Sequence, residues 1–314
     1  MDANKDKIKA VQYDHFGHVD VLKIVELPKP SANKDEVLVK VKTAGINPGE
    51  SSIREGFLQK QFPSTFPSGQ GTDFAGIVET AGEGVTDFKA GDEVIGFSNN
   101  RNSQAEYVVV TADQLTKRPE KVSWEQAGGL FVAGSTAYAV VKAVNLSAGD
   151  TVIVSSAAGG VGSLAVQIAK NKGAKVIGIA SEENHSWLKK HGIVPVTYEG
   201  DVEENLKAAL NGAKANAFID TAGKGYVELA IKMGIPADKI NTIIDFAAVE
   251  KYKVKAEGSA AASTAQVLGE LAQWINDGEL DMPIAKTYTL SQVKDAYIEL
   301  EKRHTHGKIV LAIS

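Results

Sequence analysis

The spacing of hydrophobic residues divides the chain into two stretches with different secondary structure. Residues 8 to about 120 contain short, β-rich hydrophobic runs between frequent glycines and prolines, as at residues 37–42, 76–80 and 93–97. Short strands separated by such turn signals are typical of a barrel-like or sandwich β domain. We therefore expect the first part of the chain to form a β domain.

From about residue 121 the pattern changes to alternating helices and strands. Residues 124–143 carry small and hydrophobic side chains at helical spacing. Beyond them, strands are expected at residues 151–155, 175–180, 194–198, 217–220 and 241–245, and helices at residues 161–172, 185–191, 202–210 and 227–233. Such alternation with short connections predicts a parallel, doubly wound sheet, whose strands should be apolar on both faces.

The C-terminal tail has two further helical patterns, at residues 265–275 and 291–301, and a last strand at residues 308–313. We expect this strand to complete a sheet of the first domain and not to add a sixth strand to the second. The predicted α/β organisation is thus a first domain of residues 1–120, completed by residues 265–314, and a second domain of residues 121–264.

Composition narrows the range of functions. The 314 residues include 34 basic and 39 acidic side chains, for a net charge of -5, so no strongly basic surface is available for nucleic acid or an anionic membrane. The chain has no cysteine, which excludes disulfides, thiolate catalysis and zinc sites built on sulfur. The polar N-terminus lacks a secretory pattern, and no hydrophobic run is long enough to span a bilayer. These features predict a soluble, cytoplasmic protein.

A glycine-rich turn follows the first strand of the predicted parallel sheet. It keeps the spacing of a dinucleotide-binding turn, with alanine in the first position, over residues Ala157, Ala158, Gly159, Gly160, Val161 and Gly162. Ala157 keeps the turn tight, Gly159 lets the backbone approach a pyrophosphate, and Gly162 lets the following helix lie close to the sheet. The amides at the start of that helix then face the phosphates. The alternative is a plain strand-to-helix turn.

The end of the second strand bears on the choice between NADP and NAD. An acidic side chain there accepts hydrogen bonds from the ribose hydroxyls of NAD, whereas this strand ends at the neutral Ser181, which would not repel a 2′-phosphate. Glu182 and Glu183 follow at once. If both point to solvent, NADP is favoured, and if either turns inward, NAD is favoured. We expect NADPH, with NADH the less favoured alternative.

Several sequence blocks in the same order resemble the zinc-independent quinone oxidoreductase branch, the zeta-crystallin-like group, of the medium-chain dehydrogenase/reductase superfamily. The resemblance covers almost the whole chain and is carried by residues 44–48, 54–56, 71–78, 91–94, 105–108, 134–138, 157–162 and 307–311. It implies a GroES-like β domain, a Rossmann domain, and hydride transfer from NADPH to a quinone or an α,β-unsaturated carbonyl. It also implies a homodimer.

The resemblance also implies that zinc is absent. Zinc-dependent relatives carry a Gly-His-Glu block, where this chain has Gly71-Thr72-Asp73, so Thr72 replaces the histidine ligand. A zinc alcohol dehydrogenase is therefore nearly excluded.

The resemblance also bears on the choice of cofactor. Some relatives have a lysine at the Asn184 position that binds the 2′-phosphate, and its loss here weakens the expectation of NADPH.

The same resemblance assigns roles to individual residues. Asn47 is implied near the nicotinamide, Thr136 facing the cofactor, and Lys308 near the cofactor. The backbone after the fourth and fifth strands is implied to hold the nicotinamide half, at Ala222, Gly223, Phe246 and Ala247. Tyr198 would lie near the adenine or the 2′-phosphate. Packing at a strand end is the alternative for Tyr198, and a plain surface position is the alternative for Lys308.

Hydride transfer to a polarised acceptor requires orientation and a donor for the developing oxyanion. The candidate donors are Asn47, Arg54, a backbone amide and water. Phe57, Phe62 and Phe66 are expected either to line a pocket for a flat substrate or to belong to the local core of the β domain. A protein that binds NADP(H) as a sensor or interaction partner, with little turnover, is the alternative function.

Overall fold

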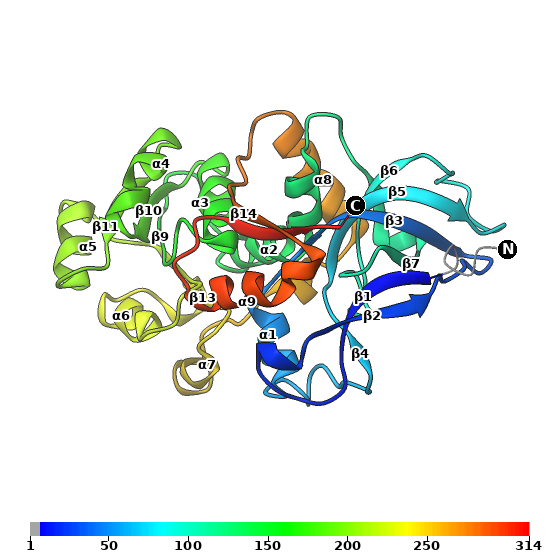
Figure 1. Ribbon diagram of the computed structural model, residues 1–314. Coiled ribbons are helices and arrows are strands. Elements are labelled where there is room, and N and C mark those ends of the chain that lie inside the picture. Colours follow the sequence, from blue (N-terminus) through cyan, green and yellow to red (C-terminus); the bar gives the residue numbers. More distant parts are fainter. Residues whose placement is uncertain (1–6, 314) are drawn as a thin grey trace, which may run out of the picture. The chain divides into compact units, whose positions relative to one another are not determined.

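The computed structural model describes residues 7–313, and residues 1–6 and 314 lie outside the described part (Figure 1). The described chain divides into two compact units. The β unit comprises residues 7–132, 263–276 and 284–313, and the α/β unit comprises residues 133–262 and 277–283. The chain therefore passes from the first unit to the second within one long helix, α2 (Trp124–Ala143).

The β unit is built on a mixed seven-stranded sheet within the described residues. Its strands run in the order β14-β15-β3-β5-β6-β8, and β7 also pairs with β3. These strands are β3 (Glu36–Gly45), β5 (Asp73–Ala81), β6 (Glu93–Phe97), β7 (Tyr107–Thr111), β8 (Leu115–Lys117), β14 (Ile284–Thr289) and β15 (Lys308–Ala312). A smaller sheet has the order β2-β1-β4, with β1 (Lys7–Tyr13), β2 (Lys23–Pro28) and β4 (Ser68–Gly69).

Three complete helices belong to the β unit: α1 (Pro48–Arg54), α8 (Ala265–Asn276) and α9 (Val293–Glu301). Short 3₁₀ turns precede or join the strands at η1 (Val19–Val21), η2 (Ala112–Gln114) and η6 (Leu290–Gln292). The last strand, β15, pairs antiparallel with β3, with Val310 opposite Gly45. The C-terminal tail is therefore part of the β-unit sheet, and its hydrophobic side chains pack with those of β1 and α9.

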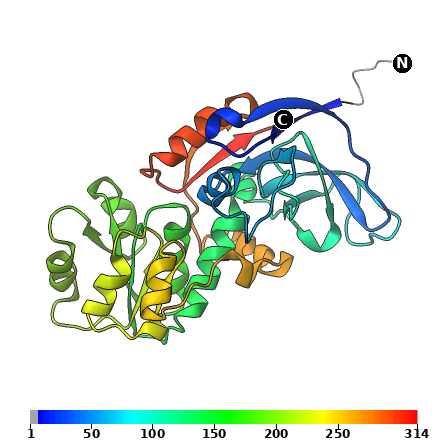
Figure 2. The ribbon, with the colours of Figure 1, turned by 90° about the horizontal axis from the view of Figure 1, so that it is seen from below.

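The α/β unit contains a parallel sheet in the order β11-β10-β9-β12-β13, as the alternating pattern predicts. Its strands are β9 (Thr151–Val154), β10 (Lys175–Ala180), β11 (Val194–Thr197), β12 (Ala217–Asp220) and β13 (Ile240–Thr242). In Figure 1, α3 (Gly160–Asn171) and α4 (His185–Lys190) lie on one side of this sheet and α6 (Tyr226–Lys232) on the other. The unit also contains α5 (Val202–Leu210), α7 (Phe246–Tyr252), and the 3₁₀ turns η3 (Glu182–Asn184), η4 (Ala237–Lys239) and η5 (Ser259–Ala262). Figure 2 shows the same elements after a quarter turn.

The sheet order places the first strand, β9, beside both β10 and β12. The chain direction across the sheet therefore reverses at β9, and in open α/β sheets ligands bind at the carboxyl ends of the strands beside such a reversal.

The strand predicted at residues 241–245 is wrong at its C-terminal end. Residues 243–245 do not continue β13, because Asp245 caps α7 by accepting a hydrogen bond from the Ala248 amide (3.0 Å).

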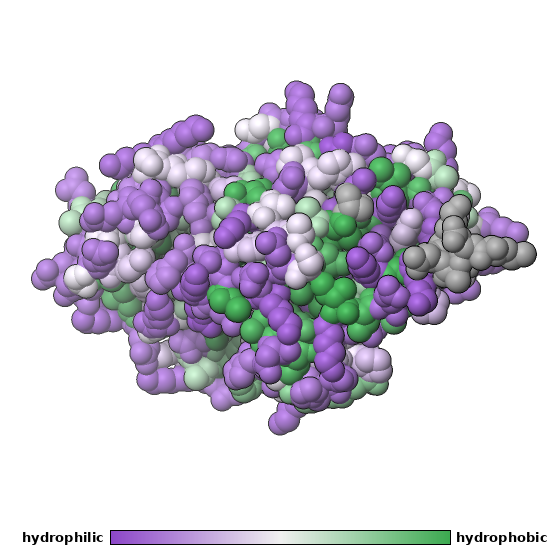
Figure 3. Space-filling view, viewed as in Figure 1, coloured by the Kyte–Doolittle hydropathy of each residue, from purple (hydrophilic) through white to green (hydrophobic). Residues whose placement is uncertain are grey.

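Hydrophilic side chains cover most of the face shown in Figure 3, and hydrophobic ones gather on it over β1 and β2. Phe57, Phe62 and Phe66, in the segment between α1 and β4, are exposed, with 75% of Phe57 accessible to solvent. They are therefore not local core, which was one of the two expectations for them. Within residues 7–313, no helix is long and apolar enough to cross a membrane.

Candidate functional site

The glycine turn joins β9 to α3 through a backbone that only small residues allow. Ser156 has a positive φ of 47°, and the Gly159 amide donates to the Ser156 carbonyl (2.9 Å). A Cβ on Gly162 would lie 2.0 Å from the Ser156 carbonyl oxygen, so any side chain there would displace the backbone. A Cβ on Gly159 would chiefly meet the Ser156 hydroxyl at 2.9 Å, which can rotate away. Gly162 is thus required by packing, whereas a Cβ on Gly159 would meet only the Ser156 hydroxyl and, at 3.3 Å, the Ser156 carbonyl.

The first turn of α3 offers a site for an anion. Gly159 is the N-cap of this helix of 12 residues, and an α-helix leaves its first amides without intrahelical acceptors. Those amides and the positive end of the helix dipole attract phosphate groups. Ala157 and Ala158 are buried, and the Ala157 amide donates to the Ile179 carbonyl of β10 (2.9 Å). The cradle is therefore fixed to the adjacent strand.

Asp220, at the end of β12, fixes the next loop. Its buried carboxylate accepts hydrogen bonds from the amides of Ala222 (3.0 Å) and Gly223 (2.9 Å). It also accepts from the hydroxyls of Ser155 (2.7 Å) and Thr242 (2.8 Å). The carboxyl ends of β9, β12 and β13 are thereby tied together, and Asp220 has a structural role.

The remaining predicted cofactor residues of the α/β unit differ in solvent exposure. Thr136, in α2, is buried, whereas Tyr198 is largely exposed just beyond β11. Phe246 and Ala247 are the first residues of α7, and Phe246 is exposed. The sequence places these residues after strands, and the structure puts the last two in a helix that the hydrophobic pattern does not reveal.

Glu183 approaches the end of the second strand of the parallel sheet. The Ser181 hydroxyl donates to its carboxylate (3.1 Å) and accepts from the side-chain amide of Asn184 (2.8 Å). Glu183 is nevertheless solvent-exposed. Glu182 is exposed as well, so both acidic side chains face solvent, which is the arrangement that favours NADP. The Glu183 carboxylate beside Ser181 opposes a 2′-phosphate by like-charge repulsion, so it weakens that preference.

The β unit contains a buried polar network centred on Glu50. Both carboxylate oxygens accept hydrogen bonds: from the Asn47 amide (3.0 Å), the Asn47 side chain (3.2 Å), the Thr72 amide (3.1 Å) and the Tyr297 hydroxyl (2.6 Å). The Tyr297 hydroxyl in turn accepts from the side chains of Gln70 and Gln104, each at 2.8 Å. Burial raises the pKa of Glu50, and burial beside Glu50 raises the pKa of Tyr297.

Lys308 inserts its ammonium into the same network. It donates to the Asn47 side-chain oxygen (2.6 Å) and the Ile46 carbonyl (2.7 Å), and lies 4.0 Å from the Asp73 carboxylate. Burial raises the pKa of Asp73 from 3.8 to about 6, although the nearby ammonium opposes this change. Burial also lowers the pKa of Lys308. The network therefore holds one cation between two carboxyl groups out of contact with water.

The structure brings Asn47 and Lys308 together, but not Arg54. The Arg54 side chain is fully buried, donates to Glu301 (3.2 Å) and the Gly17 carbonyl (3.3 Å), and stacks on Tyr297. Its Nε and Nη2 atoms are thus engaged within the β unit, whereas Nη1 is buried without a hydrogen-bond partner among the described residues.

The sequence argument missed Tyr297, Asp73, Gln70 and Gln104 as members of the network. One local signal was available, since Asn47 and Glu50 form a capping box at the start of α1.

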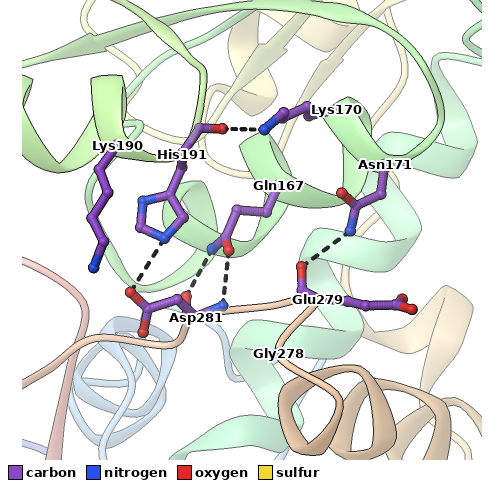
Figure 4. A pocket seen from close by; sticks show the side chains of 8 residues that line it. All are labelled: Gln167, Lys170, Asn171, Lys190, His191, Gly278, Glu279 and Asp281. Carbon is purple, nitrogen blue, oxygen red and sulfur yellow. Dashed lines mark hydrogen bonds and ion pairs between the residues drawn. The ribbon is translucent and has the colours of Figure 1, made fainter.

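A separate cavity of about 500 Å³ lies in the α/β unit (Figure 4). It is lined by Gln167, Lys170, Asn171, Lys190, His191, Gly278, Glu279 and Asp281. The Gln167 side chain bonds both the amide (2.8 Å) and the carbonyl (2.7 Å) of Asp281, whose carboxylate lies 3.3 Å from His191. Because Gln167 and Lys170 are in the second half of α3, this cavity is distinct from the glycine turn at the helix start.

Comparisons with known proteins agree with this architecture. Residues 33–120 match the family described as alcohol dehydrogenase GroES-like domain, and residues 191–311 match the family described as zinc-binding dehydrogenase. The chain is 30% identical to the NADPH-dependent alkenal/one oxidoreductase, chloroplastic, of Arabidopsis thaliana, over 97% of this chain and 79% of that protein. It is 29% identical to quinone oxidoreductase 1 of Escherichia coli, over 96% of this chain and 98% of that protein.

Solved structures with the same fold include the quinone oxidoreductase from Coxiella burnetii, with a TM-score of 0.88 and 32% identity over 98% of this chain and 100% of that one. The Escherichia coli quinone oxidoreductase complexed with NADPH has a TM-score of 0.82 and 25% identity, over 97% of this chain and 99% of that one. These similarities extend over both units, and they agree with the sequence blocks that carry the predicted resemblance. The chain therefore belongs to the quinone oxidoreductase branch of the medium-chain dehydrogenase/reductase superfamily.

Proposed function

We propose that this protein is an NADPH-dependent, zinc-independent oxidoreductase that reduces a quinone or an α,β-unsaturated carbonyl. The observation that carries the proposal is the cradle at residues 157–162, where a buried turn presents the first amides of α3 beside the reversal point of a parallel sheet. The relatives named as quinone and alkenal/one oxidoreductases support the acceptor class, and the alkenal/one oxidoreductase is named as NADPH-dependent.

The proposed cofactor site extends from the cradle in two directions. Ala157, Ala158, Gly159, Gly160, Val161 and Gly162 would bind the pyrophosphate, with Ser181 and Tyr198 at the adenosine end. Thr136, Ala222, Gly223, Phe246 and Ala247 would orient the nicotinamide half. When bound, the cofactor supplies the hydride, and the protein contributes orientation and exclusion of water.

For the acceptor oxygen, we propose a backbone amide or water as donor in preference to Arg54. The guanidinium of Arg54 is buried and bonded to Glu301 and Gly17, so its role is to position α1. Asn47 is also buried, and its side chain bonds Glu50 and Lys308. We therefore assign Asn47 to the support of the site.

The donor set near Thr72 does not fit a zinc ion. Zinc in proteins is bound by nitrogen, sulfur or carboxylate ligands, and here the Lys308 ammonium lies among the oxygens of Ile46, Asn47 and Asp73, where a second cation would be repelled. Among residues 7–313, no cluster of three or more histidine or acidic side chains is arranged to hold a metal ion. We propose that turnover is unaffected by chelators, and stoichiometric zinc in the active protein would contradict this.

The test of the function is NADPH oxidation against a panel of quinones and alkenals, together with cofactor titration by fluorescence. Gly159→Ala should weaken NADPH binding at least about tenfold, because its Cβ would lie where the pyrophosphate approaches the turn. Its melting temperature should fall less than that of Gly162→Ala, because the Cβ meets the Ser156 hydroxyl at 2.9 Å and the Ser156 carbonyl at 3.3 Å. Gly162→Ala is the matched variant and should destabilise the fold, since its Cβ would meet the Ser156 carbonyl at 2.0 Å. Absence of turnover across the whole panel would refute the proposal.

A cofactor-binding protein with little turnover is the second candidate. It is favoured by one observation, namely that both predicted oxyanion donors, Asn47 and Arg54, are buried and bonded within the β unit. Tight NADPH binding without reduction of any acceptor would establish it.

We also propose that the protein is a cytoplasmic homodimer. Light scattering would test the oligomeric state, and cell fractionation would test the location.

A further inference from the structure

Among the described residues, the ammonium of Lys308 lies 4.0 Å from the buried Asp73 carboxylate of the β-unit network, and its charge also acts on the buried carboxyl group of Glu50. It lies between the Ile46 carbonyl and the Asn47 side-chain oxygen, at 2.7 and 2.6 Å. The Lys308 side chain is 5% exposed and that of Asp73 is fully buried. A buried ammonium without such partners would lose its proton, so these oxygens form a site built for a cation.

The ammonium fixes which way the Asn47 amide points. The oxygen of that amide faces Lys308, and its nitrogen donates to Glu50 at 3.2 Å. An exchange of the two amide positions would place the NH₂ group against the ammonium and the oxygen against a carboxylate, and both contacts would be repulsive. Lys308 and Glu50 together therefore hold the end of β3 and the first turn of α1 in one arrangement.

Asp73 provides a second, independent sign of a cation site. Its Oδ1 accepts from the Val132 amide at 3.2 Å, whereas its fully buried Oδ2 has no hydrogen-bond partner among the described residues. The Lys308 ammonium lies 4.0 Å from Oδ2. Thr72, next to Asp73, is tied through its amide to Glu50. The charge on Lys308 therefore acts on residues 46–50 and 72–73 together.

We propose that Lys308 is a positioning residue for the proposed reaction, an internal cation that orients Asn47 and offsets negative charge on the buried carboxyl groups of Glu50 and Asp73. This inference rests on the proposed function. It differs from the role in cofactor contact that the family resemblance implies for Lys308, because the ammonium donates to two β-unit oxygens and faces a third. The occupant of the site is a primary ammonium, so a small alkylammonium ion has the matching chemistry once the side chain is truncated.

The first test separates positioning from cofactor contact. Lys308→Met keeps an unbranched side chain of similar volume, one atom shorter, and removes the charge. We expect kcat to fall about 10- to 100-fold, as small misplacements of supporting groups do, while the dissociation constant for NADPH stays within about twofold. Lys286→Met, at an exposed position of the adjacent strand β14, is the matched control and should change neither value. A loss of NADPH affinity with unchanged kcat would overturn the proposal in favour of cofactor contact.

The second test does not depend on turnover. Lys308→Ala should be stabilised against urea by methylammonium or ethylammonium, and its kcat should recover at least about fivefold, because these ions restore the missing ammonium. Tetramethylammonium at equal ionic strength, which cannot donate hydrogen bonds, should have neither effect, and the wild type should not respond. If the wild type reduces no acceptor, the proposed function fails, and the positioning role fails with it. Stabilisation by methylammonium would still identify the cation site, whereas turnover in the wild type without rescue of Lys308→Ala would refute the site alone.

Discussion

Removal of one hydroxyl, by Tyr297→Phe, tests the energetic weight of the buried network around Glu50. Tyr297 is fully buried, and its ring can be retained by phenylalanine without a change of shape. The variant deletes three hydrogen bonds: the 2.6 Å bond to the Glu50 carboxylate and the two 2.8 Å bonds from Gln70 and Gln104. The perturbation therefore reports on hydrogen bonding with little contribution from packing.

The expected loss follows from the kind of each bond. A hydrogen bond to a charged group contributes about 1.5–3 kcal/mol, and each neutral one about 0.5–1.5 kcal/mol, with a larger cost when a buried donor is left unpaired. Gln70 and Gln104 are both buried, and no water can replace the hydroxyl without a cavity. We expect the free energy of unfolding of the β unit to fall by about 4 kcal/mol.

Urea unfolding, combined with hydrogen exchange of peptides from β3 and β15, measures this loss in the unit concerned. Tyr13→Phe is the matched control, because Tyr13 is equally buried but its hydroxyl makes only a 3.4 Å contact with Ser64. That variant should lose less than about 1 kcal/mol. Equal losses in the two variants would show that the network contributes no more than an ordinary buried tyrosine, and the reasoning would be wrong.

Three further outcomes are expected from single substitutions. Asp73→Asn should gain stability relative to the wild type as the pH rises from 4 to 6, by about 3 kcal/mol in urea titrations. The reason is that the folded-state pKa of Asp73 is raised from 3.8 to about 6, so the wild type loses stability as this buried carboxyl group ionises, whereas asparagine does not titrate. A constant difference in stability across this pH range would contradict the assignment. Glu183→Gln should shift the ratio of kcat/KM values toward NADPH over NADH by about tenfold, because it removes a carboxylate beside Ser181, and an unchanged ratio would place Glu183 outside the cofactor site. Phe57→Ala should raise KM for apolar acceptors about tenfold with an unchanged melting temperature, because its ring is 75% exposed, and an unchanged KM would exclude it from the acceptor pocket.

The α/β unit was predictable because its signals are local. The strands at residues 175–180 and 217–220 and the helix at 202–210 agree in full with β10, β12 and α5, since each combines a clear hydrophobic pattern with flanking turns. The strand at residues 241–245 was overextended, because Ile243 and Ile244 favour a strand while Asp245 begins a helix by capping it. The 7-residue helix α1 was missed because the glycines and prolines of this stretch, Pro48 among them, were interpreted together as turn signals, although proline is also favoured in the first helical turn.

The two parts of the candidate site also differ in how local their sequence signals are. The glycine turn lies within a few consecutive residues, and its spacing alone indicates a cradle for phosphate. The network of the β unit combines Glu50, Asp73, Tyr297 and Lys308, which are far apart in the sequence. No periodicity connects such residues, and only strand pairing together with the packing of α1 and α9 brings them together. The resemblance suggested Asn47 and Lys308 separately and gave no indication that they bond to each other.

The pairing of β15 with β3 is what creates this bond. Val310 lies opposite Gly45 and Leu311 opposite Ala44, so the same antiparallel register places residue 308 opposite residue 47. The Ile46 amide donates to the Ile309 carbonyl at 3.3 Å, so the pairing of the two strands extends to the residues next to 47 and 308. A shift of one residue in this register would turn the Lys308 side chain to the other face of the sheet and leave Glu50 and Asp73 buried without a cation. The electrostatics of the network therefore select the register of the C-terminal strand, and the return of the tail to the β unit is a requirement of the site as well as of the sheet.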